Sequence, residues 1–487
     1  MRMLFLDLDT LRPDHLGCYG YHRNTSPNID RIAAEGLRFE NYHCSDAPCL
    51  PSRAALTTGM FGYHNGAVNH GGTNADLRHF GPERGFRDPI LMNNLWNRIR
   101  QAGFHMSSIS TFSERHSSYW FDAGFNEIYN IGKGGGESAE EVWPIIESWL
   151  DRNAAADNWF LHVNLWDPHT PYRVPEEYGN PFADSPIPAW LTEEVLTRHQ
   201  QHPGPHGILE TGMYTDQLAR HYPRQPGAAR TMEELKTLLD GYDVGIHYAD
   251  WHVGRILERL DALGVLEDTI IIVTSDHGEN QGELGIYAEH GTADQITTRI
   301  PMIIRWPGMT QGVDRGLHYS LDLLPTLAEI WEQEAAPHWD GRSYAATLRD
   351  GTDTGREYLV LSQNAHVCQR SVRWDHYIYI RTLHDGYHLF PDEMLFDLEA
   401  DPHETEYLAE ARPDLCGRAA RWLLDWETRM RRTARHVEDP MSRILLEGGP
   451  YHARGELPAW AERLERTGRA EAAAELRRRH PGEFRGR

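Results

Sequence analysis

The seven residues from Thr269 to Ser275 constrain the fold more than any other stretch of the chain. They read Thr-Ile-Ile-Ile-Val-Thr-Ser, a continuous β-branched run without polar alternation. A strand with apolar side chains on both faces needs cover on both faces, which is typical of the centre of a parallel sheet. We therefore expect an α/β fold.

Strand-like runs alternate with helical patterns over the first two-thirds of the chain. We expect strands at 4–9, 107–110, 160–166 and 300–306, and helices at 27–36, 52–58, 90–102, 139–151, 232–263 and 321–332. Such alternation indicates a mostly parallel sheet with helices on both faces, whose ligands bind beyond the carboxyl ends of the strands. Asp9 and Asp276 each end a strand, so we expect both at that edge.

The pattern changes along the chain and predicts three parts: an α/β domain over 1–351, a small α+β subdomain over 352–435 and a polar helical tail over 436–487. Within the first, 174–230 is rich in Pro, His, Glu and Gly and predicts an excursion near the pocket. Short β segments at 358–362, 371–381 and 394–397, then a helix at 413–433, predict a small antiparallel sheet. We expect the tail to be solvated or to contact another chain.

Charge and cysteine content exclude several classes of protein. The 487 residues include 72 Asp and Glu against 48 Lys and Arg, a formal charge of −24. This field argues against nucleic acid and membrane partners, and an anionic substrate would need local positive charge. We find no apolar run as long as a membrane span and no leader before the first strand, so we expect a cytoplasmic protein. Five scattered cysteines without a C-x-x-C spacing indicate neither a disulfide framework nor a zinc knot.

The run from Cys49 to Gly59 reads C-x-P-S-R-x-x-L-x-T-G. It begins a short predicted helix, where free backbone N–H groups favour an anion and Arg53 can fork onto a negative oxygen. The run resembles the active-site signature of the type I sulfatases, formylglycine-dependent members of the alkaline phosphatase superfamily that are similar also to phosphonate monoester hydrolases. An alkaline-phosphatase-like fold is then implied.

The resemblance implies a covalent mechanism. A formylglycine-generating enzyme would oxidise Cys49 to an aldehyde, whose hydrated form carries two hydroxyls on one carbon. One hydroxyl attacks sulfur, and the other expels sulfate by re-forming the aldehyde.

Two further segments resemble the metal-binding motifs of the family: Asp9 with the residues that follow it, and Thr274-Ser275-Asp276-His277-Gly278-Glu279. The resemblance implies that Asp9, Asp276, His277 and the modified Cys49 bind one divalent cation, which activates the attacking hydroxyl. His277 stands where many members carry asparagine, and an imidazole ligand favours manganese over calcium. The choice between manganese and calcium is left open.

The chain also differs from the family pattern directly after Asp9. Many sulfatases carry a second acid directly after Asp9, where this chain has Thr10. Either Thr10 or Asp7, on the same strand face as Asp9, could complete the metal site.

The remaining candidate residues are mostly histidines. His169, in Trp166-Asp167-Pro168-His169, resembles the family histidine that contacts sulfate and protonates the leaving oxygen, a role that suits imidazole. His290 keeps its family position, but Glu289 replaces a usual lysine. The family's G-K-W-H segment is absent, so that Arg115 or His116 could take its role. Whether His64 faces the substrate is left open.

The sequence therefore predicts a sulfuric ester hydrolase acting on a small sulfated sugar, aryl or alkyl ester, and possible homo-oligomers. One alternative is a phosphonate monoester or phosphodiester hydrolase of the same superfamily, which His277 favours and the C-P-S-R run disfavours. Another is a catalytically silent binding protein, which the intact Cys49, Arg53, Asp9 and Asp276 argue against.

Overall fold

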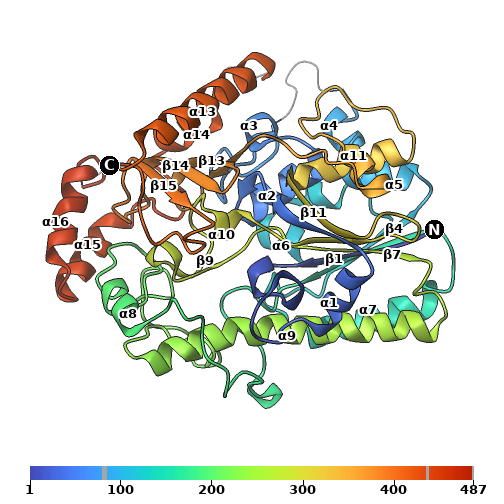
Figure 1. Cartoon of the computed structure of the whole chain (residues 1–487), viewed down its shortest axis with the longest axis horizontal. Helices are drawn as coiled ribbons and strands as arrows, with labels where there is room; N and C mark the ends of the chain where they lie inside the picture. The colour runs from blue at the N-terminus through green and yellow to red at the C-terminus, as the bar shows by residue number, and fades with distance from the viewer. Residues whose placement is uncertain (79–84, 435–437, 485–487) are drawn as a thin grey trace.

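The computed structural model of the protein describes residues 1–78, 85–434 and 438–484 (Figure 1). Its centre is an eight-stranded sheet in the order β11-β2-β10-β7-β1-β6-β4-β5. All neighbouring strands run parallel except β10, which is antiparallel to both β7 and β2. The strands are β1 (Arg2–Leu8), β2 (Leu37–His43), β4 (His105–Ile109), β5 (Glu127–Tyr129), β6 (Trp159–Leu165), β7 (Thr269–Thr274), β10 (Met302–Arg305) and β11 (Gly312–Tyr319).

Helices cover both faces of this sheet, as Figure 1 shows. Alternate residues of β7 enter two separate cores: Ile271 and Val273 pack with one face, Ile270 and Ile272 with the other. The expected doubly covered, mostly parallel sheet is thus confirmed. One face carries α1 (Pro27–Ala34), α7 (Ala139–Asn153) and α9 (Met232–Ala262), and the other carries α2 (Cys49–Thr58), α5 (Leu95–Gln101) and α11 (Leu323–Ile330).

The expected helix at 90–102 is interrupted. The side chain of Asn94 accepts a hydrogen bond from the backbone N–H of Asn97 and begins a new helix there. The residues before it form the separate helix α4 (Pro89–Met92). The other short helices of the described chain are α3 (Gly62–Asn65), α6 (Phe112–His116), α8 (Glu193–His199), α10 (Gln295–Thr298) and α12 (Ala345–Asp350).

The C-terminal part forms the expected small antiparallel sheet, in the order β15-β14-β13-β12-β3. The segment expected at 371–381 is in fact a hairpin of two strands that turns at Asp375, whose φ is 45°. The strand β3 (Asp46–Ala47) comes from the first domain and pairs in parallel with β12 just before Cys49. The other strands are β12 (Leu359–Gln363), β13 (Cys368–Trp374), β14 (Tyr377–His384) and β15 (Glu393–Asp397), with α13 (Pro413–Thr433) beside them.

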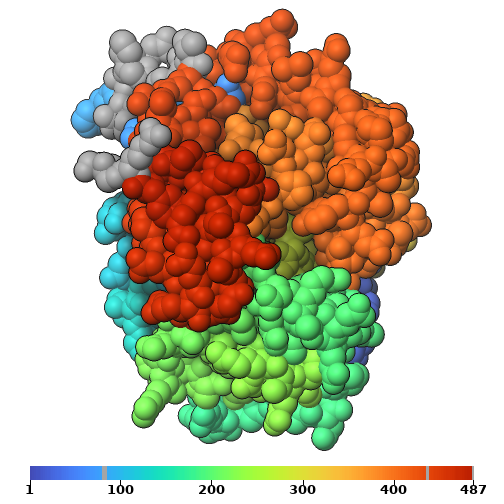
Figure 2. All heavy atoms as spheres, turned by 90° about the vertical axis from the view of Figure 1, so that its left-hand side faces the viewer, coloured from blue at the N-terminus to red at the C-terminus, as the bar shows by residue number. Residues whose placement is uncertain are grey.

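Residues 438–484 of the tail are folded onto the rest of the molecule, so the expectation of a solvated segment is wrong for them. In Figure 2 its residues, drawn in red, lie against the orange subdomain and the green segment around 200–230. Trp460 is 2% exposed and donates to the carbonyl of Pro203, and Arg469 forms an ion pair with the buried Glu210. Its helices are α14 (Pro440–Leu446), α15 (Leu457–Arg466) and α16 (Ala470–Arg479).

Among the described residues, no helix is long and apolar enough to cross a membrane. All five cysteines are described, and each has a free thiol.

Candidate active site

The carboxyl ends of four adjacent strands meet at one edge of the large sheet. Asp9 follows β1, Asp276 follows β7, and His169 lies four residues after β6. The short helix α6, which carries Arg115, follows β4. Parallel strands place their following loops on the same side, so residues distant in sequence converge there.

Cys49 is the first residue of α2 and is 1% exposed. Its Sγ lies 3.1 Å from Nε2 of His277. Burial raises the pKa of the Cys49 thiol, the carboxylates of Asp9 and Asp276 raise it further, and the guanidinium groups of Arg53 and Arg115 oppose them. An unmodified Cys49 would therefore be a poor thiolate nucleophile.

Arg53, one turn into α2, contacts three carboxylates of the site. Its guanidinium lies 2.9 Å from Asp7, 3.0 Å from Asp9, and in close contact with Asp276. Although burial opposes ionisation, Arg53 holds the pKa of Asp7 below its usual value. Burial and the Asp276 charge instead raise the pKa of Asp9 well above its usual range. With every carboxylate ionised, three negative charges face one guanidinium, so a divalent cation would neutralise the remainder.

The donor set fits such a cation. One ligand atom each from Asp9, Cys49, Asp276 and His277 lies within 4.8 Å of the others, and all four residues are buried. Oδ1 of Asp9 is buried without a hydrogen-bond partner, which is costly unless something else satisfies it. Two carboxylates and an imidazole suit a divalent ion, and the imidazole shifts the preference toward manganese or a similar transition metal.

The two open candidates for completing this set differ in their surroundings. Asp7 uses Oδ2 to accept from Arg53 and to approach His162, and it is not part of the close donor group. Thr10 has a positive φ of 57° and places a buried Oγ1 without a hydrogen-bond partner next to Asp9. Thr10 therefore keeps an unpaired oxygen, whereas Oδ2 of Asp7 is already engaged by Arg53, and the choice between them stays a prediction.

His169 and His290 both lie beside this group. Nε2 of His169 lies 4.0 Å from Oδ1 of Asp9, while Nδ1 hydrogen-bonds the carbonyl of Thr170. The ring of His290 lies 4.1 Å from that of His277 and 5.4 Å from that of His169, measured between centroids. Burial lowers the pKa of both histidines well below the usual value, so both are neutral at pH 7 until an anion arrives.

Glu289, in the short strand β9 (Tyr287–Glu289) beside β8 (Asn280–Gln281), lies just beyond His290. Its carboxylate is 3.1 Å from His290, 2.7 Å from His206 and 3.6 Å from His366. Burial opposes ionisation, but the surrounding imidazoles hold the pKa of Glu289 well below its usual range. The Glu289 carboxylate is therefore held ionised among imidazoles, which offset its charge to the extent that they are protonated.

Arg115 and His116 are adjacent on α6 but have different neighbours. The guanidinium of Arg115 lies over the ring of Trp166 at 5.0 Å, and its charge acts on both Cys49 and Asp9. The ring of His116 instead contacts those of His70 and Phe112, each at 5.1 Å. Arg115 is therefore the better placed of the two to supply positive charge near Cys49.

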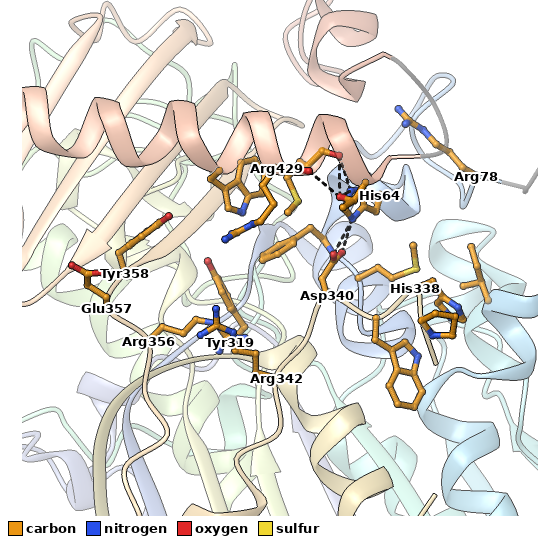
Figure 3. Close-up of a pocket in the computed structure, with 18 residues that line it drawn as sticks. His64, Arg78, Tyr319, His338, Asp340, Arg342, Arg356, Glu357, Tyr358 and Arg429 are labelled. Carbon is orange, nitrogen blue, oxygen red and sulfur yellow. Dashed lines mark hydrogen bonds and ion pairs between the residues drawn. The ribbon is translucent and has the colours of Figure 1, made fainter. Parts of the chain in front are cut away.

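His64 lies in a different pocket, of about 690 Å³, that none of the residues of the Cys49 group lines. Figure 3 shows His64 joined to Asp340 there, with Arg342, Arg356 and Tyr319 among the other lining residues. This position does not support a role for His64 beside the substrate.

Sequence reasoning missed one set of side chains completely. His70, His206, His366 and His452 come from separate loops and gather near His290. The chain has 28 histidines, but no spacing pattern distinguishes these four, because tertiary packing alone brings them together.

Comparisons with known proteins agree with this geometry. The profile of the family described as Sulfatase matches residues 3–331. An arylsulfatase of Clostridium perfringens is 25% identical, over 83% of this chain and 89% of that protein.

Two solved structures share the fold. The phosphonate monoester hydrolase of Agrobacterium radiobacter has a TM-score of 0.68 at 20% identity, covering 88% of this chain and 96% of that chain. A protein solved in complex with its substrate D-glucosamine-2-N,6-O-disulfate also has a TM-score of 0.68, at 18% identity, covering 90% and 99%.

Proposed function

The chain belongs to the sulfatase family, and from this premise we propose that it hydrolyses sulfate esters with a formylglycine made from Cys49 and one divalent metal ion. Family membership confirms the resemblance noted in the sequence. The observation that carries the proposal is the position of Cys49: it begins a helix, and its Sγ lies among the donor atoms of Asp9, Asp276 and His277.

The chemistry follows from the neighbours of Cys49. A hydrated aldehyde there would supply the attacking hydroxyl, and a cation held by Asp9, Asp276 and His277 would favour its ionised form. Arg53 fixes the orientation of the carboxylates, and Arg115 adds positive charge toward the incoming anion. Mass spectrometry of the peptide containing Cys49 tests the proposal, with p-nitrophenyl sulfate turnover measured with and without co-expressed formylglycine-generating enzyme. Turnover that is equal in both, with unmodified Cys49, would contradict it.

His169 is the proposed proton donor to the leaving oxygen. Its Nδ1 is bound to the carbonyl of Thr170, which leaves Nε2 to face the site, and an anionic ester would raise the pKa of its ring. We expect His169→Ala to lower kcat by about 10² to 10⁴-fold for alkyl sulfates, and far less for p-nitrophenyl sulfate, whose leaving group needs no proton. His202→Ala, which changes a half-buried histidine outside the Cys49 group, is the control. An equal loss on both esters would exclude this role.

Phosphonate monoester hydrolysis is the second candidate function. The favouring observation is the contact between Cys49 and His277, together with the fold shared with a phosphonate monoester hydrolase. Like sulfate monoesters, phosphonate monoesters carry one negative charge, so the same site could accept both.

The negative charge of Glu289 leads to a prediction about selectivity. We expect phosphate monoester dianions to be poorer substrates than p-nitrophenyl sulfate and p-nitrophenyl phenylphosphonate. Glu289→Gln removes this charge and should raise kcat/KM for p-nitrophenyl phosphate relative to the sulfate by about fivefold, equivalent to about 1 kcal/mol at an effective dielectric near 20. Glu404→Gln, another buried carboxyl, serves as control. If the phosphate monoester is the best of the three for the unaltered enzyme, the proposed electrostatics are wrong.

The natural substrate and the location of the protein stay predictions. A structural neighbour binds a disulfated glucosamine, so sulfated sugars are the first compounds to assay, followed by aryl and alkyl sulfates. A cytoplasmic location is tested by cell fractionation, and possible homo-oligomers by light scattering.

A further inference from the structure

Three histidines from separate parts of the chain converge at the border of the two sheets. His70 lies in the loop after α3, His366 lies between β12 and β13, and His452 lies between α14 and α15. One ring nitrogen of each lies within 4.8 Å of the other two. Nδ1 of His70 and Nε2 of His452 are 3.0 Å apart.

We propose that His70, His366 and His452 bind a second metal ion, separate from the ion at Cys49. The group contains imidazoles alone, a set that suits Zn²⁺, Co²⁺, Ni²⁺ or Cu²⁺ and is poor for calcium or magnesium. Two imidazole nitrogens on one tetrahedral ion stand about 3.3 Å apart. The His70–His452 pair is close to this spacing at 3.0 Å, and an ion would replace the hydrogen bond that now joins the two rings.

The surroundings hold these side chains in place. The backbone N–H of His452 donates to the carbonyl of Ala365, beside His366. The rings of His366 and His452 stack with centroids 4.2 Å apart. The carboxylate of Glu289 lies 3.6 Å from Nε2 of His366, an ion-pair distance that is too long for a direct hydrogen bond.

One polar atom of the group remains unsatisfied. Nε2 of His70, the ring nitrogen outside the 3.0 Å contact with His452, is buried without a hydrogen-bond partner, which a water bound to the ion could supply. His70 and His452 remain partly exposed, which gives an ion access from solvent.

The proposed ion would lie close to the Cys49 group. His366 lies 5.9 Å from His290, which in turn lies 4.1 Å from His277, between ring centroids. With three protein ligands, a tetrahedral ion keeps one open position, which takes water or an oxygen of an anionic ligand. Such an ion would supply positive charge beside Glu289 in a strongly acidic protein.

Metal content tests the proposal independently of enzymatic activity. We would strip the full-length protein of metal, add Co²⁺, remove the excess and measure bound cobalt and its visible spectrum. We expect two ions per chain in the unaltered protein, one in His366→Ala and His452→Ala, and one in Asp276→Ala. The ion that Asp276→Ala retains should be lost in the Asp276→Ala, His452→Ala double variant.

The control is His202→Ala, which breaks the neighbouring His202–His388 pair (2.9 Å between nitrogens) and should keep two ions. Should His366→Ala fail to fold, His70→Ala, in a partly exposed loop, gives the same comparison. The proposal is overturned if the unaltered protein binds a single ion that Asp276→Ala removes, or if the histidine variants bind as much cobalt as the unaltered protein.

Discussion

Replacing Cys49 by serine is expected to lower kcat for sulfate esters by about three orders of magnitude or more. A serine hydroxyl in this position could accept the sulfuryl group, but the resulting ester would have no second hydroxyl on the same carbon to expel sulfate. Because Cys49 is buried at the start of α2 with no disulfide, the smaller hydroxyl should leave the fold intact. Stopped-flow and steady-state turnover of p-nitrophenyl sulfate measure the effect.

The serine variant also separates the first chemical step from the second. A burst of p-nitrophenol equal to at most one turnover, followed by near silence, would show that attack survives and release does not. Cys44→Ser changes another buried cysteine five residues away and should keep its activity. Full turnover by Cys49→Ser would refute the formylglycine mechanism, whereas loss of activity in both variants would point to general damage to α2.

Much of the fold could be predicted because its central strands carry a strong local signal. Every residue of β7 from Ile270 to Val273 contacts a core, on alternating faces, and this is what a continuous β-branched run indicates. Breaks within long patterns were harder to predict. The turn at Asp375 and the new helix at Asn94 depend on a single backbone conformation and a single cap, inside stretches whose periodicity continues.

The tail illustrates a different limit. Its polar composition predicted contact with solvent or with another chain, yet Trp460 and Leu464 are buried in a small core, and Trp460 donates to the carbonyl of Pro203. A narrow apolar stripe on a charged helix is enough for packing, but the sequence does not state which surface it meets.

Some residues of the candidate site could be predicted from the sequence, and others could not. Asp9, Asp276 and His169 could be identified because they follow predicted strands, and parallel strands send their following residues to one edge. Arg115 and His116 are neighbours on the five-residue helix α6 and point to different partners, Trp166 and His70. Only the position of that helix decides which of them approaches Cys49.

The second large effect is expected for Asp276→Ala, which should remove the metal ion at Cys49 and nearly all activity together. Asp276 supplies one of the two carboxylates of the proposed ligand set, and without the ion the attacking hydroxyl would lose its activation. The fold should persist without the ion at Cys49, because Asp276 lies beyond the end of β7 and its charge opposes that of Asp9. Elemental analysis, turnover and thermal unfolding, each with and without added Mn²⁺, check the three parts of this prediction.

Thermal unfolding distinguishes a metal ligand from a structural carboxylate. A bound ion stabilises the folded state in proportion to the logarithm of its concentration over its dissociation constant, so added Mn²⁺ should raise the Tm of the unaltered protein more than that of Asp276→Ala. Asp243→Ala is the matched control. This buried carboxylate pairs with His15 and Arg23, so its loss should lower the free energy of unfolding by about 3–5 kcal/mol and with it the Tm. The response of the Cys49 site to Mn²⁺ should stay unchanged. Asp276→Ala with full turnover, or with an unchanged response to Mn²⁺, would place the catalytic metal elsewhere.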